Sequence, residues 1–255
     1  MPRNWTEHEL LIAMNLYCKL PFGKLNHQNK LLVQVAEKLD RTPSSVSMKL
    51  CNYASFDPAL QARGIKGLRG ASQADKQMWE AFTANWNHMS EQSESAYEAL
   101  MTGAAEQETS PPPETVPPTG PSEVERTVKT RRLQTFFRNA VLASYEFRCA
   151  VSGVAVPELL TASHIIPWRA DESRRADPTN GLCLNALYDR AFDRGLITFD
   201  EDFRLMISGH LKKGDAPEFQ QINFIAREGA KLILPHRFSP DAAALQKHRD
   251  SIFIA

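Results

Sequence analysis

The chain has 255 residues, of which 42% are hydrophobic and 24% are charged, and its 30 Lys and Arg residues balance its 30 Asp and Glu residues. This length suffices for two modest domains, and no stretch approaches the roughly 20 apolar residues that a membrane-spanning helix needs. Because the first ten residues also lack the apolar core of a secretory signal, we expect a cytoplasmic protein without a membrane partner.

The charges are unevenly distributed along the chain. Residues 1–70 hold ten basic and five acidic side chains, residues 71–127 hold two and ten, and residues 128–255 hold eighteen and fifteen. Two net-basic segments separated by an acidic one are consistent with two modules that face nucleic acid across a solvated spacer. Ordinary surface variation explains the charges equally well, so the charge pattern alone leaves the partner open.

The N-terminal segment predicts a series of helices. Thr6 and Glu9 have the spacing of a capping box, and an amphipathic pattern follows them as far as Pro21. A second helix is indicated by apolar residues that share one face: Leu31, Leu32, Val35, Ala36 and Leu39. Thr42 and Pro43 are typical first residues of a third helix that should reach about residue 53, and a fourth helix is predicted over about residues 72–89.

Three short helices with a tight turn before the third predict a helix-turn-helix arrangement. Residues 5–52 also resemble a Myb-type or other tri-helical DNA-binding module, in the opening Trp-Thr-x-x-Glu and in the Arg-Thr-Pro-Ser-Ser-Val run at 41–46. The exposed face of the third helix would offer small polar and basic contacts to nucleic acid: Ser44, Ser45, Ser47, Lys49 and Asn52. A helical bundle that binds a recruiting protein partner is the alternative for residues 1–100.

A proline-rich, acidic stretch forms the clearest boundary in the chain. Six prolines lie between residues 111 and 121, and large apolar residues are almost absent there. Such a segment cannot bury a core and should be a disordered, extended tether. We therefore expect a helical domain over residues 1–100, a linker over 101–127 and a second domain over 128–255.

The C-terminal segment mixes helix and strand patterns. An amphipathic helix is predicted over about residues 128–145, with a buried stripe made of Leu133, Phe136, Phe137, Ala140 and Val141. Residues 159–168 read as a strand that ends in a loop, and a helix over about 185–194 should stop at Gly195. Short strands are predicted at 196–199 and 205–207. The whole chain is therefore expected to be α+β, with an all-α N-terminal module.

Three residues of this segment could together hydrolyse a phosphodiester. That reaction needs an activated water and a cation at the scissile phosphate. A neutral histidine such as His164 is the natural base near neutral pH, and carboxylates suit Mg²⁺. Asp189 and Asp193 are four residues apart, so a helix places both on one face.

The order of these residues resembles the HNH endonuclease family. Residues 148–202 contain Ala-Ser-His-Ile-x-Pro-Trp at 162–168, Asn-Gly-Leu at 180–182 and Asp-x-x-Phe-Asp-x-Gly-x-Ile at 189–197. The resemblance implies a ββα-metal fold with His164 as the general base. It further implies that Asn180 pins the loop and orients the base, and that Asp189 and Asp193 ligate Mg²⁺, Mn²⁺ or another divalent cation.

The chain departs from the family pattern in two places. Many members have Asp or His directly before the base as a metal ligand, where this chain has Ser163. Many also carry a Cys-x-x-Cys zinc pair ahead of the base, whereas Cys149 is followed three positions later by Ser152. We therefore expect no structural zinc, and we expect packing to hold this part of the fold.

The sequence thus predicts a metal-dependent DNA endonuclease with an N-terminal targeting module, a layout that resembles restriction and other bacterial defence nucleases. Ser163 keeps open a non-catalytic nucleic-acid-binding protein with a decayed HNH domain, and an RNase or RNA-directed toxin is a further alternative. A homodimer would make a double-strand cut easier, and the sequence leaves the oligomeric state open.

Overall fold

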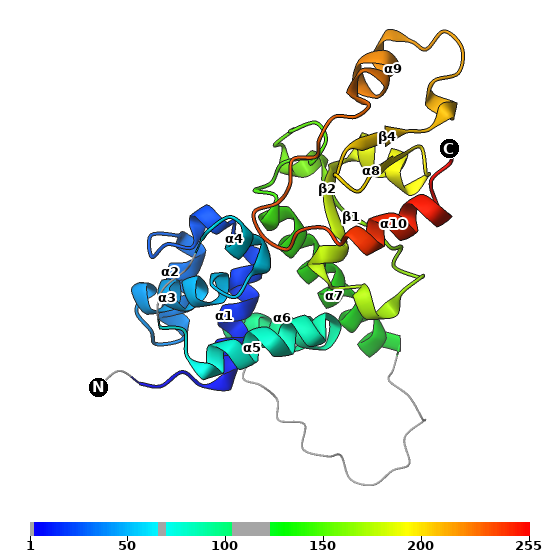
Figure 1. Cartoon of the computed structure of the whole chain (residues 1–255). Coiled ribbons are helices and arrows are strands. Elements are labelled where there is room, and N and C mark those ends of the chain that lie inside the picture. The colour runs from blue at the N-terminus through cyan, green and yellow to red at the C-terminus, as the bar shows by residue number, and fades with distance from the viewer. Residues whose placement is uncertain (1–2, 66–69, 104–122) are drawn as a thin grey trace.

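The computed structural model describes residues 3–65, 70–103 and 123–255 of the chain (Figure 1). The described N-terminal residues form α-helices joined by short connections and one 3₁₀ turn. The helices are α1 (Glu7–Lys19), α2 (Lys30–Lys38), α3 (Pro43–Ala54), α4 (Pro58–Ala62), α5 (Gln73–Ala84) and α6 (Trp86–Thr102). The first three lie where the apolar periodicity predicts helices.

Local capping explains where these helices begin. The Thr6 hydroxyl accepts a hydrogen bond from the Glu9 amide at 3.2 Å, and the Glu9 carboxylate accepts one from the Thr6 amide at 2.8 Å. This reciprocal pair is the predicted capping box, and it is confirmed. The side chain of Thr42 caps α3 by accepting a hydrogen bond from the Ser45 amide, with Pro43 as the first helical residue.

The predicted fourth helix over residues 72–89 is wrong, because two helices occupy this region. Asn85 ends α5 and begins α6, with an extended φ of −150°. Its side chain accepts a hydrogen bond from the His88 amide at 3.1 Å. An asparagine side chain can replace the backbone acceptor in this way, and the continuous apolar pattern across the break concealed it. The short helix α4 was also missed, although Asp57 and Pro58 are typical starting residues.

Helix α7 (Glu123–Ser144) begins earlier than the predicted residue 128 and packs against both halves of the molecule. Leu133, Phe136 and Ala140 belong to one hydrophobic core with the N-terminal helices. Phe137 and Val141 belong to a second core with the C-terminal strands. The predicted buried stripe is thus confirmed, and it serves two cores from adjacent faces of one helix. No helix in the described ranges is apolar enough over a sufficient length to cross a bilayer.

Residues 104–122, most of the expected linker over 101–127, lie outside the described residues. The division of the chain into domains at 1–100, 101–127 and 128–255 therefore stays a proposal.

The C-terminal part contains a β-hairpin held between two helices. Strands β1 (Leu160–His164) and β2 (Gly181–Asn185) are antiparallel, with Leu160 opposite Asn185 and His164 opposite Gly181. Helix α8 (Ala186–Asp193) follows β2 directly and packs on the hairpin, and α7 also packs against both strands. A Cβ at Gly181 would lie 2.4 Å from a methyl carbon of Val141, so only glycine permits this approach of α7.

The remaining elements cover the hairpin and α8. Strands β3 (Ile197–Phe199) and β4 (Leu205–Ile207) form a second antiparallel pair. They are followed by α9 (Glu218–Asn223) and α10 (Ala242–Ser251). Gly195 ends α8 in the left-handed conformation, with a φ of 66°, as predicted. The fold is therefore α+β.

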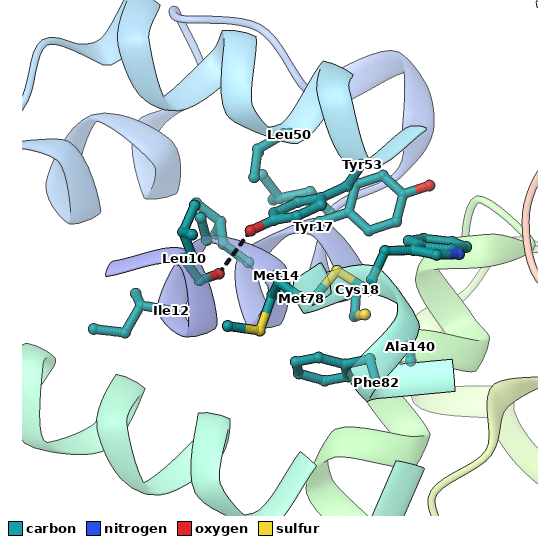
Figure 2. Packing of buried hydrophobic residues seen from close by; sticks show 14 of the residues in the cluster. Leu10, Ile12, Met14, Tyr17, Cys18, Leu50, Tyr53, Met78, Phe82 and Ala140 are labelled. Carbon is teal, nitrogen blue, oxygen red and sulfur yellow. Dashed lines mark hydrogen bonds between the residues drawn. The ribbon is translucent and has the colours of Figure 1, made fainter. Parts of the chain in front are cut away.

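The C-terminal segment before α10 enters the N-terminal core. Phe238 stacks on Trp79 of α5 with ring centroids 6.2 Å apart. The Arg237 side chain is fully buried and donates to the backbone carbonyls of Tyr17 and Leu20 at the end of α1. Figure 2 shows the core that receives this segment, in which Ala140 of α7 lies beside Phe82 of α5. The two halves of the chain are therefore packed together through shared cores.

Candidate active site

His164 is the last residue of β1, and its imidazole ring is held on three sides. The ring stacks on Phe137 of α7 with centroids 3.7 Å apart and meets the edge of Trp168 at 5.6 Å. Its Nε2 atom lies 3.0 Å from the backbone carbonyl oxygen of Arg175. A carbonyl only accepts hydrogen bonds, so we assign the proton of the neutral ring to Nε2. Nδ1 then keeps the lone pair that a general base needs.

The surroundings of His164 favour its neutral form. Burial lowers the pKa of His164 below its ordinary value, and the hydrogen bond to the Arg175 carbonyl opposes this shift without cancelling it. The ring is therefore uncharged near neutral pH and able to take up a proton.

Asn180 closes the loop between the two strands, next to the residues that follow His164. It is 1% exposed, and its side-chain oxygen accepts a hydrogen bond from the Ile166 amide at 2.8 Å. Its side-chain nitrogen donates to the carbonyls of Ile166 at 3.1 Å and of Arg174 at 3.3 Å. These bonds tie the residues directly after His164 to the far end of the same loop.

The two carboxylates, Asp189 and Asp193, lie on α8, and Ser163 lies near Asp189. Burial raises the pKa of Asp189, and the nearby Ser163 hydroxyl partly opposes that shift. Burial also raises the pKa of Asp193, and the charge of Asp189 raises it further. Two carboxylates that repel each other in a partly buried place favour either a proton or a cation between them.

The chemistry of this donor set fits a divalent cation. The Ser163 hydroxyl is buried and makes no hydrogen bond to a described residue, although it lies close enough to Asp189 to affect the pKa of that carboxyl. An unpartnered buried oxygen near Asp189 matches the oxygen ligands that Mg²⁺ prefers, with waters and phosphate completing its shell.

Ser163, which lies near Asp189, and His164 are consecutive residues at the end of β1. Successive strand residues point to opposite faces, so Ser163 faces α8 while His164 faces α7. In the part of the chain that the structure describes, no three His, Cys, Asp or Glu side chains gather closely enough to hold a metal. Asp189 and Asp193 are only two such side chains. The candidate cation site therefore needs the Ser163 hydroxyl as a third oxygen.

A cavity of about 260 Å³ opens beside His164. Its lining comes from α7, β1 and the loop after β1: Gln134, Phe137, Arg138, Thr161, Ala162, His164 and Trp168. Arg138 donates to the Leu160 carbonyl at 3.0 Å and brings a positive charge to this cavity. Our reading of the sequence missed Arg138, although it directly follows the buried Phe137 on the predicted helix.

The stretch where the family often has a zinc pair is held by hydrogen bonds. Cys149 is buried, and its sulfur accepts bonds from the amides of Ser152 at 3.4 Å and Asn185 at 3.3 Å. The Asn185 side chain also donates to the Ser152 hydroxyl at 3.1 Å. These contacts join the turn ahead of β1 to the start of α8.

The nucleic-acid contacts predicted on α3 need a correction. Lys49 and Asn52 were expected on an exposed face, but they are 8% and 7% exposed. The Lys49 ammonium lies 2.6 Å from one Asp75 oxygen, and the Asn52 amide donates to the other at 2.9 Å. Asp75 belongs to the capping box at the start of α5, so these side chains join α3 to α5. Asp75 lies too far from Lys49 and Asn52 in the sequence for this contact to be foreseen. Ser44 is exposed and Ser45 is half-exposed, so both remain candidates.

A β-hairpin followed directly by a helix, with histidine on the first strand and carboxylates on the helix, is the arrangement of a ββα-metal nuclease. Residues 149–200, which include β1, β2, α8 and β3, match the family model described as HNH endonuclease. No curated protein matches the chain. Residues 149–200 therefore form an HNH endonuclease motif, whose family is one of nucleases that act on nucleic acid and generally use a divalent metal.

Proposed function

We propose that this protein is a metal-dependent DNA endonuclease in which His164 is the general base. The observation that carries the proposal is the hydrogen bond between His164 Nε2 and the Arg175 carbonyl. It leaves Nδ1 as the free acceptor of a ring that burial keeps neutral. A base held in one tautomer beside an open cavity has the properties that proton abstraction from water requires.

The reaction follows from these side chains. Nδ1 of His164 takes a proton from a water molecule as the water oxygen attacks the phosphorus atom of the backbone. The phosphorus–oxygen bond on the opposite side breaks, and the leaving oxygen takes up a proton from solvent. Asp189 and Asp193, with Ser163 beside them, would hold a divalent cation such as Mg²⁺ or Mn²⁺, which when bound neutralises charge on the phosphate. Asn180 keeps the loop behind the base in position.

DNA is the proposed substrate because of the helical module. Helices α2 and α3 pack together through a turn at residues 39–42, an arrangement used to enter the major groove of DNA. Ser44 and Ser45 at the start of α3 are the proposed contacts in this module. A restriction or other bacterial defence role rests on the resemblance in layout alone.

The proposal is tested with supercoiled plasmid, prepared in both modified and unmodified form, in Mg²⁺, Mn²⁺ or EDTA. We expect cutting that requires the cation and that falls about 10²- to 10⁴-fold in His164→Ala. His210→Ala, which changes an exposed histidine, is the matched control and should cut normally. Cutting that persists in His164→Ala would refute the assignment of the base.

The same experiment separates the alternatives. A parallel RNA substrate that is cut in preference to plasmid would identify an RNase. Intact binding of DNA without cleavage in any cation would indicate a non-catalytic protein with a decayed site, the outcome that Ser163 keeps open. Purified protein with no salt-dependent affinity for DNA would point to a protein partner for the helical module.

A further inference from the structure

The carbonyl that holds His164 belongs to a peptide group with a second partner. The Arg175 carbonyl faces His164, and the amide of the next residue, Ala176, belongs to the same planar unit. That Ala176 amide donates to the side-chain oxygen of Asn87 at 2.8 Å. Asn87 lies on α6, in the N-terminal half of the chain, 89 positions before Ala176. One peptide group therefore connects the candidate base to the helical module.

Asn87 holds this loop by a second bond as well. Its side-chain nitrogen donates to the backbone carbonyl of Glu172, three residues before Arg175. The Asn87 amide thus spans the loop segment 172–176 from outside, with its donor and its acceptor both in use. Asn180 holds the same loop from inside through the Arg174 carbonyl.

Burial makes the bond from Ala176 matter. Ala176 is fully buried and belongs to the hydrophobic core of the N-terminal helices. Without Asn87 its amide would be a donor lacking a partner in a buried place, which is unfavourable. The peptide group would relieve this cost by rotating toward another acceptor. Because the group is planar, that rotation would also turn the Arg175 carbonyl away from His164.

We propose that Asn87 is a positioning residue that fixes the ring tautomer and orientation of His164 through the Arg175–Ala176 peptide group. The proposal rests on the proposed function only where it concerns catalysis, since the hydrogen-bond relay exists whatever the substrate. Asn87 belongs to the helical module, so under this proposal the module helps to hold the His164 ring. The packing of the two halves against each other then sets the geometry of the site.

The test uses the full chain with ¹⁵N-labelled histidine in EDTA, read by NMR of the imidazole nitrogens. In the wild type we expect His164 Nε2 to be protonated and Nδ1 to be unprotonated. In Asn87→Ala the two tautomers should exchange, giving averaged nitrogen shifts. Asn87→Asp keeps the acceptor for Ala176 and should restore the wild-type signature. Gln92→Ala changes an exposed amide on the same helix and is the matched control.

The activity readout should separate positioning from binding. We expect kcat on plasmid to fall about 10- to 100-fold in Asn87→Ala, the usual effect of losing an orienting partner, with KM nearly unchanged. If Asn87→Ala fails to fold, the near-isosteric Asn87→Leu removes both bonds and replaces it. Wild-type nitrogen shifts in a folded Asn87→Ala or Asn87→Leu protein would overturn the proposal. If no protein cuts nucleic acid, the proposed function fails while the NMR result still decides the role of Asn87.

Discussion

His248 on α10 is a buried neutral histidine, and acid should destabilise the protein through it. The ring is 2% exposed, stacks on Phe192 of α8 at 3.8 Å and shares a hydrogen bond of 2.9 Å with the Thr198 hydroxyl. Its Nε2 lies 3.2 Å from the Phe192 carbonyl. Burial lowers the pKa of His248 to about 4, the bond to that carbonyl opposes the shift, and the charge of Arg249 adds to it.

The magnitude follows from the difference between the folded pKa and the ordinary value of 6.5. Because the folded pKa is depressed, the unfolded chain binds the proton more readily, and stability falls as the pH drops below about 6.5. At about pH 5 the unfolded imidazole is almost fully protonated and the folded one is about one-tenth protonated. The free energy of unfolding should therefore fall by about 2 kcal/mol between about pH 7.5 and about pH 5 through this residue alone.

The assay is urea denaturation at both pH values for the wild type and for His248→Gln. Carboxylates titrate equally in both proteins, so the difference between the two pH responses isolates His248. We expect the wild type to lose about 2 kcal/mol more than His248→Gln on acidification. His210→Gln, at an exposed position, should respond as the wild type does. An identical pH response in the wild type and His248→Gln would refute the reasoning.

Two further predictions concern buried charges. Lys49→Met leaves the buried Asp75 carboxylate without its cation and should lower the free energy of unfolding by about 3 kcal/mol, measured by urea denaturation. An unchanged stability with weaker DNA binding would instead restore Lys49 to the nucleic-acid contacts. Arg237→Met leaves two carbonyls at the end of α1 without donors and should cost about 3 kcal/mol in the same assay. A loss below about 1 kcal/mol would show that the α1 end does not depend on Arg237.

Local sequence patterns predicted much of the fold. Capping residues such as Thr6 and Thr42 define helix starts within a few positions, so no distant contact is needed to place them. The pattern failed at Asn85, where a side chain replaces a backbone acceptor inside a continuous apolar periodicity. The order of His164, Asn180, Asp189 and Asp193 along the chain indicated the nuclease family without any tertiary contact.

Long-range partners decided the rest. The spacing of Lys49 and Asn52 on α3 could not reveal that Asp75, on another helix, would bury both. The strand period explains why Ser163 and His164 face different helices, but only the packing of α7 and α8 shows which helix each one meets.

The sequence by itself therefore determined the class of chemistry, because residue type and spacing along one helix or strand are local properties. The contacts around the proposed base, His164, were decided by the tertiary structure alone. Asn87 and Ala176 are 89 positions apart, and a hydrogen bond between them exists only when the two halves of the chain are packed together. No local pattern encodes such a contact, since its geometry depends on how α6 and α7 lie against the hairpin.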